Sequence, residues 1–133
     1  MADSPSIVPT LLYTDPKAAI QQLTDAFGFT RAAVYENDDG VVVHAELTYG
    51  NGMVMLGSKG RGGPFDEVMA GAGPVGVYIK VDDVDAHHKR AAEQGVEILM
   101  PPTDQDYGAR DYMTRDLEGN IWSFGDYAPR IER

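Results

Sequence analysis

Cysteine is absent from the 133 residues of this chain, which excludes several kinds of chemistry at once. Without thiols there is no disulfide, no thiolate metal site and no cysteine nucleophile. Long apolar runs are also missing, since no stretch approaches the roughly 18 consecutive apolar residues of a membrane-spanning helix. The sequence therefore predicts no membrane partner.

Basic residues are few, with 11 Lys and Arg against 21 Asp and Glu and a net charge of −10. Because nucleic acids and anionic membranes bind basic surfaces, this balance argues against both and favours cationic partners. Residues 1–5 have neither the basic start nor the apolar core of a signal peptide, so a cytoplasmic location is expected.

The residues that are present predict a globular protein. Hydrophobic residues make up 43% of the chain and charged residues 24%, which is unlike a disordered chain. A chain of this length buries roughly two thirds of its unfolded surface. We therefore expect one domain over residues 1–133.

The pattern of apolar residues occurs twice. A helix is expected over residues 16–27, because Asp15 is a good cap, Pro16 suits the first turn and Gly28 suits the end. The expected order in the first half is strand 7–13, helix 16–27 and strands 31–36, 41–49 and 53–57. The second half repeats it with strand 75–81, helix 83–94 and strands 97–100, 109–116 and 121–127.

The two halves align at an offset of 68 residues, which pairs Asp15 with Asp83 and Met55 with Ser123 and indicates a duplication. Turn residues at 49–52 and 117–120 predict a hairpin before the last strand of each half. Module 1 then covers about residues 5–57 and module 2 about residues 75–128. The glycine-rich segment 58–74 between them is either a bare linker or a flap over a cavity.

This arrangement resembles the vicinal oxygen chelate superfamily, the glyoxalase, bleomycin resistance protein and dioxygenase fold. The phrase Asp-Leu-Glu-Gly-Asn-Ile-Trp at 116–122 is similar to that superfamily's closing hairpin, with Leu117 in place of the usual proline. Similar stretches lie at 26–29, 44–47 and 81–85. The resemblance covers the whole chain and implies an α+β fold of two βαβββ modules, whose curved mixed sheets enclose a cavity with the helices on the outer face.

The resemblance also implies where a metal would be bound. Metal-dependent members place His, Glu or Gln at four positions, which fall here on Val8, Met55, Gly76 and Ser123. These side chains are poor ligands for a divalent metal, so we expect no metal and no cofactor. The relatives that lack the metal include resistance proteins that sequester an antibiotic without changing it.

A polar pair in the third strand complicates this interpretation. If Gly50 and Asn51 form a two-residue turn, Glu46 lies opposite Met55, and His44 lies two residues along on the same face. Such a pair could order the pocket wall, contribute to a metal site or act as an acid and base. At the constant offset, His44 and Glu46 correspond to Tyr112 and Thr114.

Other candidate residues can be explained by a structural role alone. His87 should pack under the second helix while His88 is exposed, and Trp122 and Phe124 should lie in the core. Residues 101–110 are expected to form an irregular loop, in which Tyr107, Arg110 and Asp111 either contact a ligand or form a plain surface turn. Lys80 reaches either solvent or Glu46.

The leading functional interpretation is a cytoplasmic small-molecule binder of the sequestration type, with a cationic aromatic ligand in a metal-free cavity. The alternatives are a lyase, isomerase or dioxygenase that uses His44 and Glu46 with or without a divalent metal, and an assembly module. The resemblance implies a homodimer. The residues expected to bind the ligand are Thr10, Leu12, His44, Glu46, Met53, Met55, Tyr78, Lys80, Tyr112, Thr114, Ile121 and Ser123.

Overall fold

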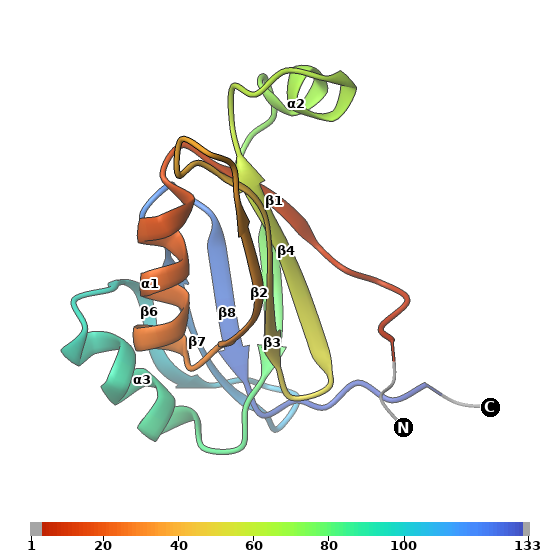
Figure 1. Ribbon diagram of the computed structural model, residues 1–133. Helices are drawn as coiled ribbons and strands as arrows, with labels where there is room; N and C mark the ends of the chain where they lie inside the picture. The colour runs from red at the N-terminus through yellow and green to blue at the C-terminus, as the bar shows by residue number, and fades with distance from the viewer. Residues whose placement is uncertain (1–3, 132–133) are drawn as a thin grey trace. The chain divides into compact units, whose positions relative to one another are not determined.

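The computed structural model describes residues 4–131 (Figure 1). The chain divides into two compact units, with the boundary in the sequence between Gly73 and Pro74, and each unit holds one four-stranded sheet. Both units have the order of the predicted βαβββ module, so the α+β prediction is confirmed. Both sheets are open at their edges. That the two modules form one domain stays a prediction.

The first sheet has the strand order β1-β4-β3-β2, with β1 parallel to β4 and the other neighbours antiparallel. The turn between β3 and β4 contains two residues, as predicted, and Gly50 has a φ of 55°. The elements of this module are β1 (Thr10–Tyr13), α1 (Pro16–Phe27), β2 (Thr30–Glu36), β3 (Val42–Tyr49) and β4 (Gly52–Ser58).

Helix α1 begins and ends where the sequence predicts. The Asp15 carboxylate accepts a hydrogen bond from the Ala18 amide at 3.1 Å, and Gly28 has the positive φ of 84° that terminates many helices. Its apolar face packs on one side of the first sheet, and α1 does not cover the other side (Figure 1). The buried strand residues of this core include Leu11, Tyr13, Ala45, Leu47, Val54 and Leu56.

The glycine-rich segment contains a short helix, α2 (Pro64–Met69), which the sequence does not predict. The Asp66 carboxylate accepts hydrogen bonds from the amides of Gly60 at 2.9 Å and Gly62 at 3.0 Å. These bonds lower the pKa of Asp66, because they stabilise its ionised form. The segment is therefore a folded loop and not a bare linker.

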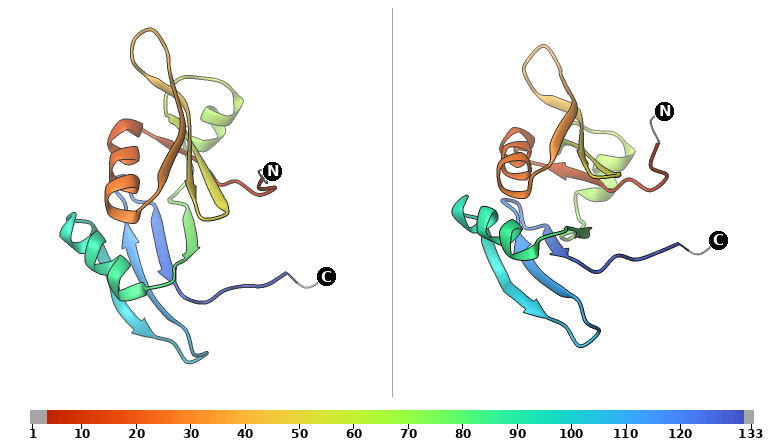
Figure 2. Two further views of the ribbon diagram at one scale, coloured as in Figure 1. Left: turned by 60° about the horizontal axis from the view of Figure 1, so that its bottom comes forward. Right: turned by 90° about the horizontal axis from the view of Figure 1, so that it is seen from below.

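The second sheet has the order β5-β8-β7-β6 and the same parallel and antiparallel pairings. Helix α3 lies along one face of this sheet (Figure 2) and is capped by Asp83, whose carboxylate accepts from the Ala86 amide at 3.0 Å. The elements are β5 (Gly76–Lys80), α3 (Val84–Glu93), β6 (Glu97–Asp104), β7 (Arg110–Arg115) and β8 (Ile121–Gly125).

The final hairpin is held together by a buried carboxylate. Asp116 is 6% exposed and accepts hydrogen bonds from the Trp122 indole at 2.9 Å and from the amides of Glu118 at 2.9 Å and Asn120 at 3.0 Å. The Asn120 side chain in turn accepts from the Val75 amide at 3.0 Å, at the start of β5. The segment 116–122, which carries the family resemblance, therefore stabilises the final hairpin through these hydrogen bonds.

Strand β6 extends further than predicted. It continues to Asp104 through Pro101 and Pro102, so the irregular loop expected from residue 101 is wrong for its first four residues. β6 is an edge strand, and its register with β7 shifts between Met100 and Thr103. An edge strand with a bulge tolerates proline, because no neighbour requires the missing amide.

Candidate functional site

The side of the first sheet that faces away from α1 carries the six predicted binding residues of the first module. We call this side the first open face. Because alternate strand residues point to opposite sides, the strand pairings place its members in rows across the sheet. One row contains Thr10, Met55, Glu46 and Ala33.

A second row contains Leu12, Gly57, His44 and Tyr35. Gly57 lies opposite His44 because the antiparallel pairing of Ala45 with Leu56 continues by one residue. Met53 lies on the same side next to Thr48. The members of both rows are half-buried or exposed apart from Gly57. The predicted placement of the first-module residues on one face is confirmed, and their contact with a ligand stays a prediction.

His44 and Glu46 form the polar centre of this face. The His44 Nε2 and the Glu46 Oε2 lie 2.8 Å apart, which is a hydrogen bond. The two side chains are 38% and 33% exposed, so a ligand on this face has access to both. A carboxylate in this position orients the imidazole ring, and its second oxygen stays available to a bound cation.

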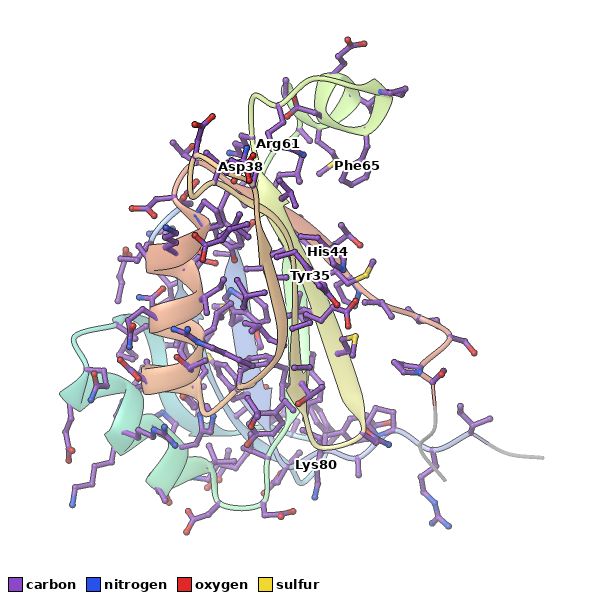
Figure 3. The ribbon with its side chains drawn as sticks, in the orientation of Figure 1. Tyr35, Asp38, His44, Arg61, Phe65 and Lys80 are labelled. Atoms are coloured by element: carbon purple, nitrogen blue, oxygen red, sulfur yellow. The ribbon has the colours of Figure 1, made fainter. Side chains whose placement is uncertain are left out.

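Tyr35 is a member of the site that the sequence reasoning missed. Its ring is nearly parallel to that of His44, with centroids 6.1 Å apart and an interplanar angle of 21°. Figure 3 shows both rings on the side of the sheet away from α1. Tyr35 is 57% exposed. An aromatic residue at the penultimate position of the predicted strand 31–36 was the available signal.

A pocket of about 270 Å³ lies at the end of this sheet where β4 leads into the glycine-rich segment. Leu12 and Gly57 of the second row belong to its lining, and Phe65 of α2 contributes from the other side. Phe65 lies toward the same side of the sheet as Tyr35 and His44 (Figure 3). The segment thus forms one wall of a pocket, and its role as a flap stays a prediction. The full lining is Leu12, Val43, Gly57, Ser58, Arg61, Gly62, Gly63, Pro64, Phe65 and Asp66.

The four positions that correspond to metal ligands do not fit a divalent ion. Met55 lies on the first open face, Gly76 and Ser123 lie on the corresponding side of the second sheet, and Val8 precedes β1. Valine and glycine have no donor side chain, a thioether prefers soft ions, and a neutral serine is a weak ligand. No group of three His, Asp or Glu side chains within residues 4–131 is arranged to hold an ion.

In the second module, the side of the sheet away from α3 carries four of the predicted residues, namely Tyr78, Lys80, Ile121 and Ser123. Lys80 binds Asp82 and is half-exposed, in agreement with the solvent alternative. Burial raises the pKa of Tyr78, and the charges of an ionised Tyr107, of Asp111 and of Asp126 raise it further.

The predicted placement of Tyr112 and Thr114 in the binding face is wrong. Both are 0% exposed on the α3 side, where Tyr112 pairs with Phe124 and Thr114 with Trp122. The physical reason is the turn: three residues lie between Asp116 and Asn120, which are joined by a backbone hydrogen bond of 2.8 Å, whereas the first turn has two. One extra residue reverses the faces of β7 relative to a constant offset.

The predictions for the core aromatic residues are confirmed, because Trp122 and Phe124 are 0% exposed. His87 packs inward as predicted, with its Nδ1 at 2.5 Å from the Tyr112 hydroxyl and its ring 4.3 Å from that of Phe124. His88 is half-buried against the edge of Tyr112 and is therefore less exposed than predicted.

No helix within residues 4–131 has both the length and the apolar character needed to cross a bilayer. The model of the Glyoxalase/Bleomycin resistance protein/Dioxygenase superfamily matches residues 7–124. An uncharacterized protein of Mycobacterium bovis is 30% identical over 125 residues, which cover 91% of this chain and 82% of that protein.

Among solved structures, TioX from Micromonospora sp. ML1 is similar at a TM-score of 0.79 with 36% identity, covering 92% of this chain and 98% of TioX. A member of the same superfamily from Sphaerobacter thermophilus has a TM-score of 0.70 with 19% identity, covering 91% of this chain and 97% of its own. The second likeness concerns the fold alone.

Proposed function

Because the chain belongs to the Glyoxalase/Bleomycin resistance protein/Dioxygenase superfamily, we propose that it binds a small organic molecule on its first open face and sequesters it without a metal. The observation that carries the proposal is the hydrogen-bonded pair of His44 and Glu46 on a face that also carries Leu12, Met53 and Met55. A few polar groups on an apolar wall are typical of ligand sites.

The proposed ligand is cationic and aromatic. Tyr35 and His44 offer two nearly parallel rings at the surface, against which a planar ring system packs. Met53 and Met55 supply deformable apolar contacts beside them. The Glu46 carboxylate neutralises a positive group on the ligand, and the net charge of −10 attracts such a ligand over distance.

Isothermal titration calorimetry with a panel of cationic aromatic compounds, including antibiotics, tests this proposal. Glu46→Gln keeps the shape and removes the charge, so binding should weaken about tenfold, which is typical of a lost charge-assisted hydrogen bond. The matched control is Glu93→Gln, an exposed carboxylate at the end of α3. No heat of binding across the panel with folded protein would contradict the proposal.

The same proposal includes a cytoplasmic homodimer. The first open face leaves apolar and aromatic side chains uncovered, and a second copy of the chain would complete the cavity around the ligand. Light scattering measures this directly. A dimer at micromolar concentration supports the shared cavity, and a monomer there removes it.

A second candidate is a lyase, isomerase or dioxygenase, and the observation that supports it is the hydrogen bond between His44 and Glu46. An imidazole and a carboxylate in contact are suited to moving a proton at a bound substrate. Elemental analysis of protein purified without chelators separates the metal-dependent version. A near-stoichiometric divalent metal that is lost on His44→Ala would overturn sequestration as the leading proposal.

A further inference from the structure

Three tyrosines gather at one end of the second sheet, and none of them is explained by the core. Tyr78 comes from β5, Tyr107 from the β6–β7 connection and Tyr127 from the residues after β8. The rings of Tyr107 and Tyr127 meet edge to face, with centroids 5.8 Å apart and an interplanar angle of 81°. The Tyr78 hydroxyl donates to the Tyr127 carbonyl at 2.7 Å.

The segment that carries Tyr127 is anchored on two sides. The Asp126 amide donates to the Arg110 carbonyl at 3.1 Å, and the Asp126 carboxylate accepts from the Arg110 amide at 2.9 Å. With the Tyr78 bond, these contacts fix the backbone on both sides of the Tyr127 ring. The ring is therefore held in place although it is 52% exposed.

Tyr107 is presented by a closed turn. The Gln105 amide donates to the Ala109 carbonyl at 2.7 Å, and Gly108 supplies a φ of 88° that other residues rarely adopt. The Gln105 side chain donates to the Asp111 carboxylate at 2.8 Å, which ties the turn to β7. Tyr107 remains 64% exposed, so its ring is accessible.

Gly125 lets Tyr78 lie flat across the sheet. A Cβ atom at this position would come within 2.8 Å of the Tyr78 hydroxyl and 2.9 Å of the Asp111 Cβ. Tyr78 therefore occupies the space that a side chain would fill, and it is 40% exposed.

Two carboxylates accompany the three rings. Asp111 and Asp126 both lie close enough to Tyr78 for their charge to oppose its ionisation. Neither takes part in an ion pair within the described chain, while the neighbouring cations are engaged: Arg110 pairs with Asp85 and Asp104, and Lys80 with Asp82. The negative charge beside the rings is thus uncompensated.

We propose that Tyr78, Tyr107, Tyr127, Asp111 and Asp126, here called the tyrosine cluster, bind a small quaternary or protonated alkylammonium group. Aromatic faces attract such cations through their quadrupoles, and adjacent carboxylates add a Coulomb attraction. The tyrosine cluster lies wholly within the second module, and this inference does not depend on the function proposed for the first open face.

The test is an amide NMR titration of the full chain with choline, in parallel with its uncharged analogue in which carbon replaces the quaternary nitrogen. Choline should shift the amides of Gly108, Asp126 and Tyr127 in the millimolar range. Tyr107→Leu and Tyr127→Leu should each weaken binding about fivefold, while Tyr107→Phe should retain it, because a phenyl ring also attracts cations. Asp126→Asn keeps the hydrogen-bonding shape and should weaken binding about threefold.

The matched control is Leu117→Ala, which removes an exposed apolar side chain from the turn at the opposite end of the second sheet and should leave choline binding unchanged. Equal binding of the uncharged analogue would overturn the proposal, since apolar contact alone would then explain the shifts. Loss of choline binding in Tyr35→Leu, with no effect of Tyr107→Leu, would overturn it by placing the cation on the first open face. Absence of any choline-induced shift would overturn it as well.

Discussion

The two modules have the same strand order and the same helix placement, yet they differ in the residues on the side of each sheet away from its helix. Opposite Met55 stands Glu46, whereas opposite the equivalent Ser123 stands Met113. The first module therefore presents a hydrogen-bonded acid and base pair where the second presents a thioether. The two modules thus share a strand arrangement and differ in surface chemistry, which is the basis for proposing that only the first open face holds the sequestered ligand.

The largest expected effect tests the reversed faces of β7. Tyr112→Ala should lower the free energy of unfolding by about 3–5 kcal/mol, because it removes a fully buried aromatic ring. Met113→Ala, one residue away on the other face, should cost only about 1 kcal/mol. Chemical denaturation measures both. Equal losses of unfolding free energy, or a larger loss for Met113→Ala, would indicate that β7 has the faces predicted from the constant offset of 68 residues.

A smaller effect is expected from the two turns. Asp116→Ala should cost about 3 kcal/mol, because it leaves the Trp122 indole and two amides without their buried acceptor. Asn51→Ala, in the exposed turn of the first module, should cost less than about 1 kcal/mol. Thermal unfolding followed by tryptophan fluorescence compares them. Similar melting temperatures for the two variants would mean that the buried Asp116 carboxylate does not stabilise the final hairpin.

The smallest effect concerns the hydrogen bond of Tyr78. Tyr78→Phe should cost about 1 kcal/mol, while Tyr35→Phe, whose ring stacks on His44, should be nearly neutral. The raised pKa of Tyr78 means that its contribution is fully present below the ordinary tyrosine value of about 10 and is lost as the pH rises through the folded-state value. Ultraviolet titration of the phenolates should lose a late-titrating group in Tyr78→Phe, and an unchanged titration curve would contradict this.

Much of the fold could be predicted from the sequence, because local chemistry specifies it. Asp15 and Gly28 bound α1 where their preferences place them, and the Gly50 turn sets the pairing of Glu46 with Met55. These features depend on neighbouring residues only.

The wrong predictions, for the face of β7 and the end of β6, concern features that residues farther along the chain determine. Tyr112 was assigned to the wrong face because one extra turn residue, several positions later in the chain, changes which residues of β7 pair with β8. β6 continues through Pro101 and Pro102 because it is an edge strand, which strand order alone determines.

Tyr35 was overlooked for a similar reason. Its value as a site residue comes from its pairing with His44 across two strands, and the bulges in β2 hide that register from simple alternation. Local patterns therefore predicted the scaffold and the first-module binding face. Site residues on irregular strands, such as Tyr35 on β2, could be identified only from the structure.

The central claim is that a cationic aromatic ligand binds the first open face. An amide NMR map of the chain with the tightest binder from the calorimetric panel tests it most directly. We expect shifts centred on Leu12, Tyr35, His44, Glu46 and Met55 that are lost in Glu46→Gln. A bound ligand whose shifts avoid these residues, or that binds Glu46→Gln equally well, would contradict it.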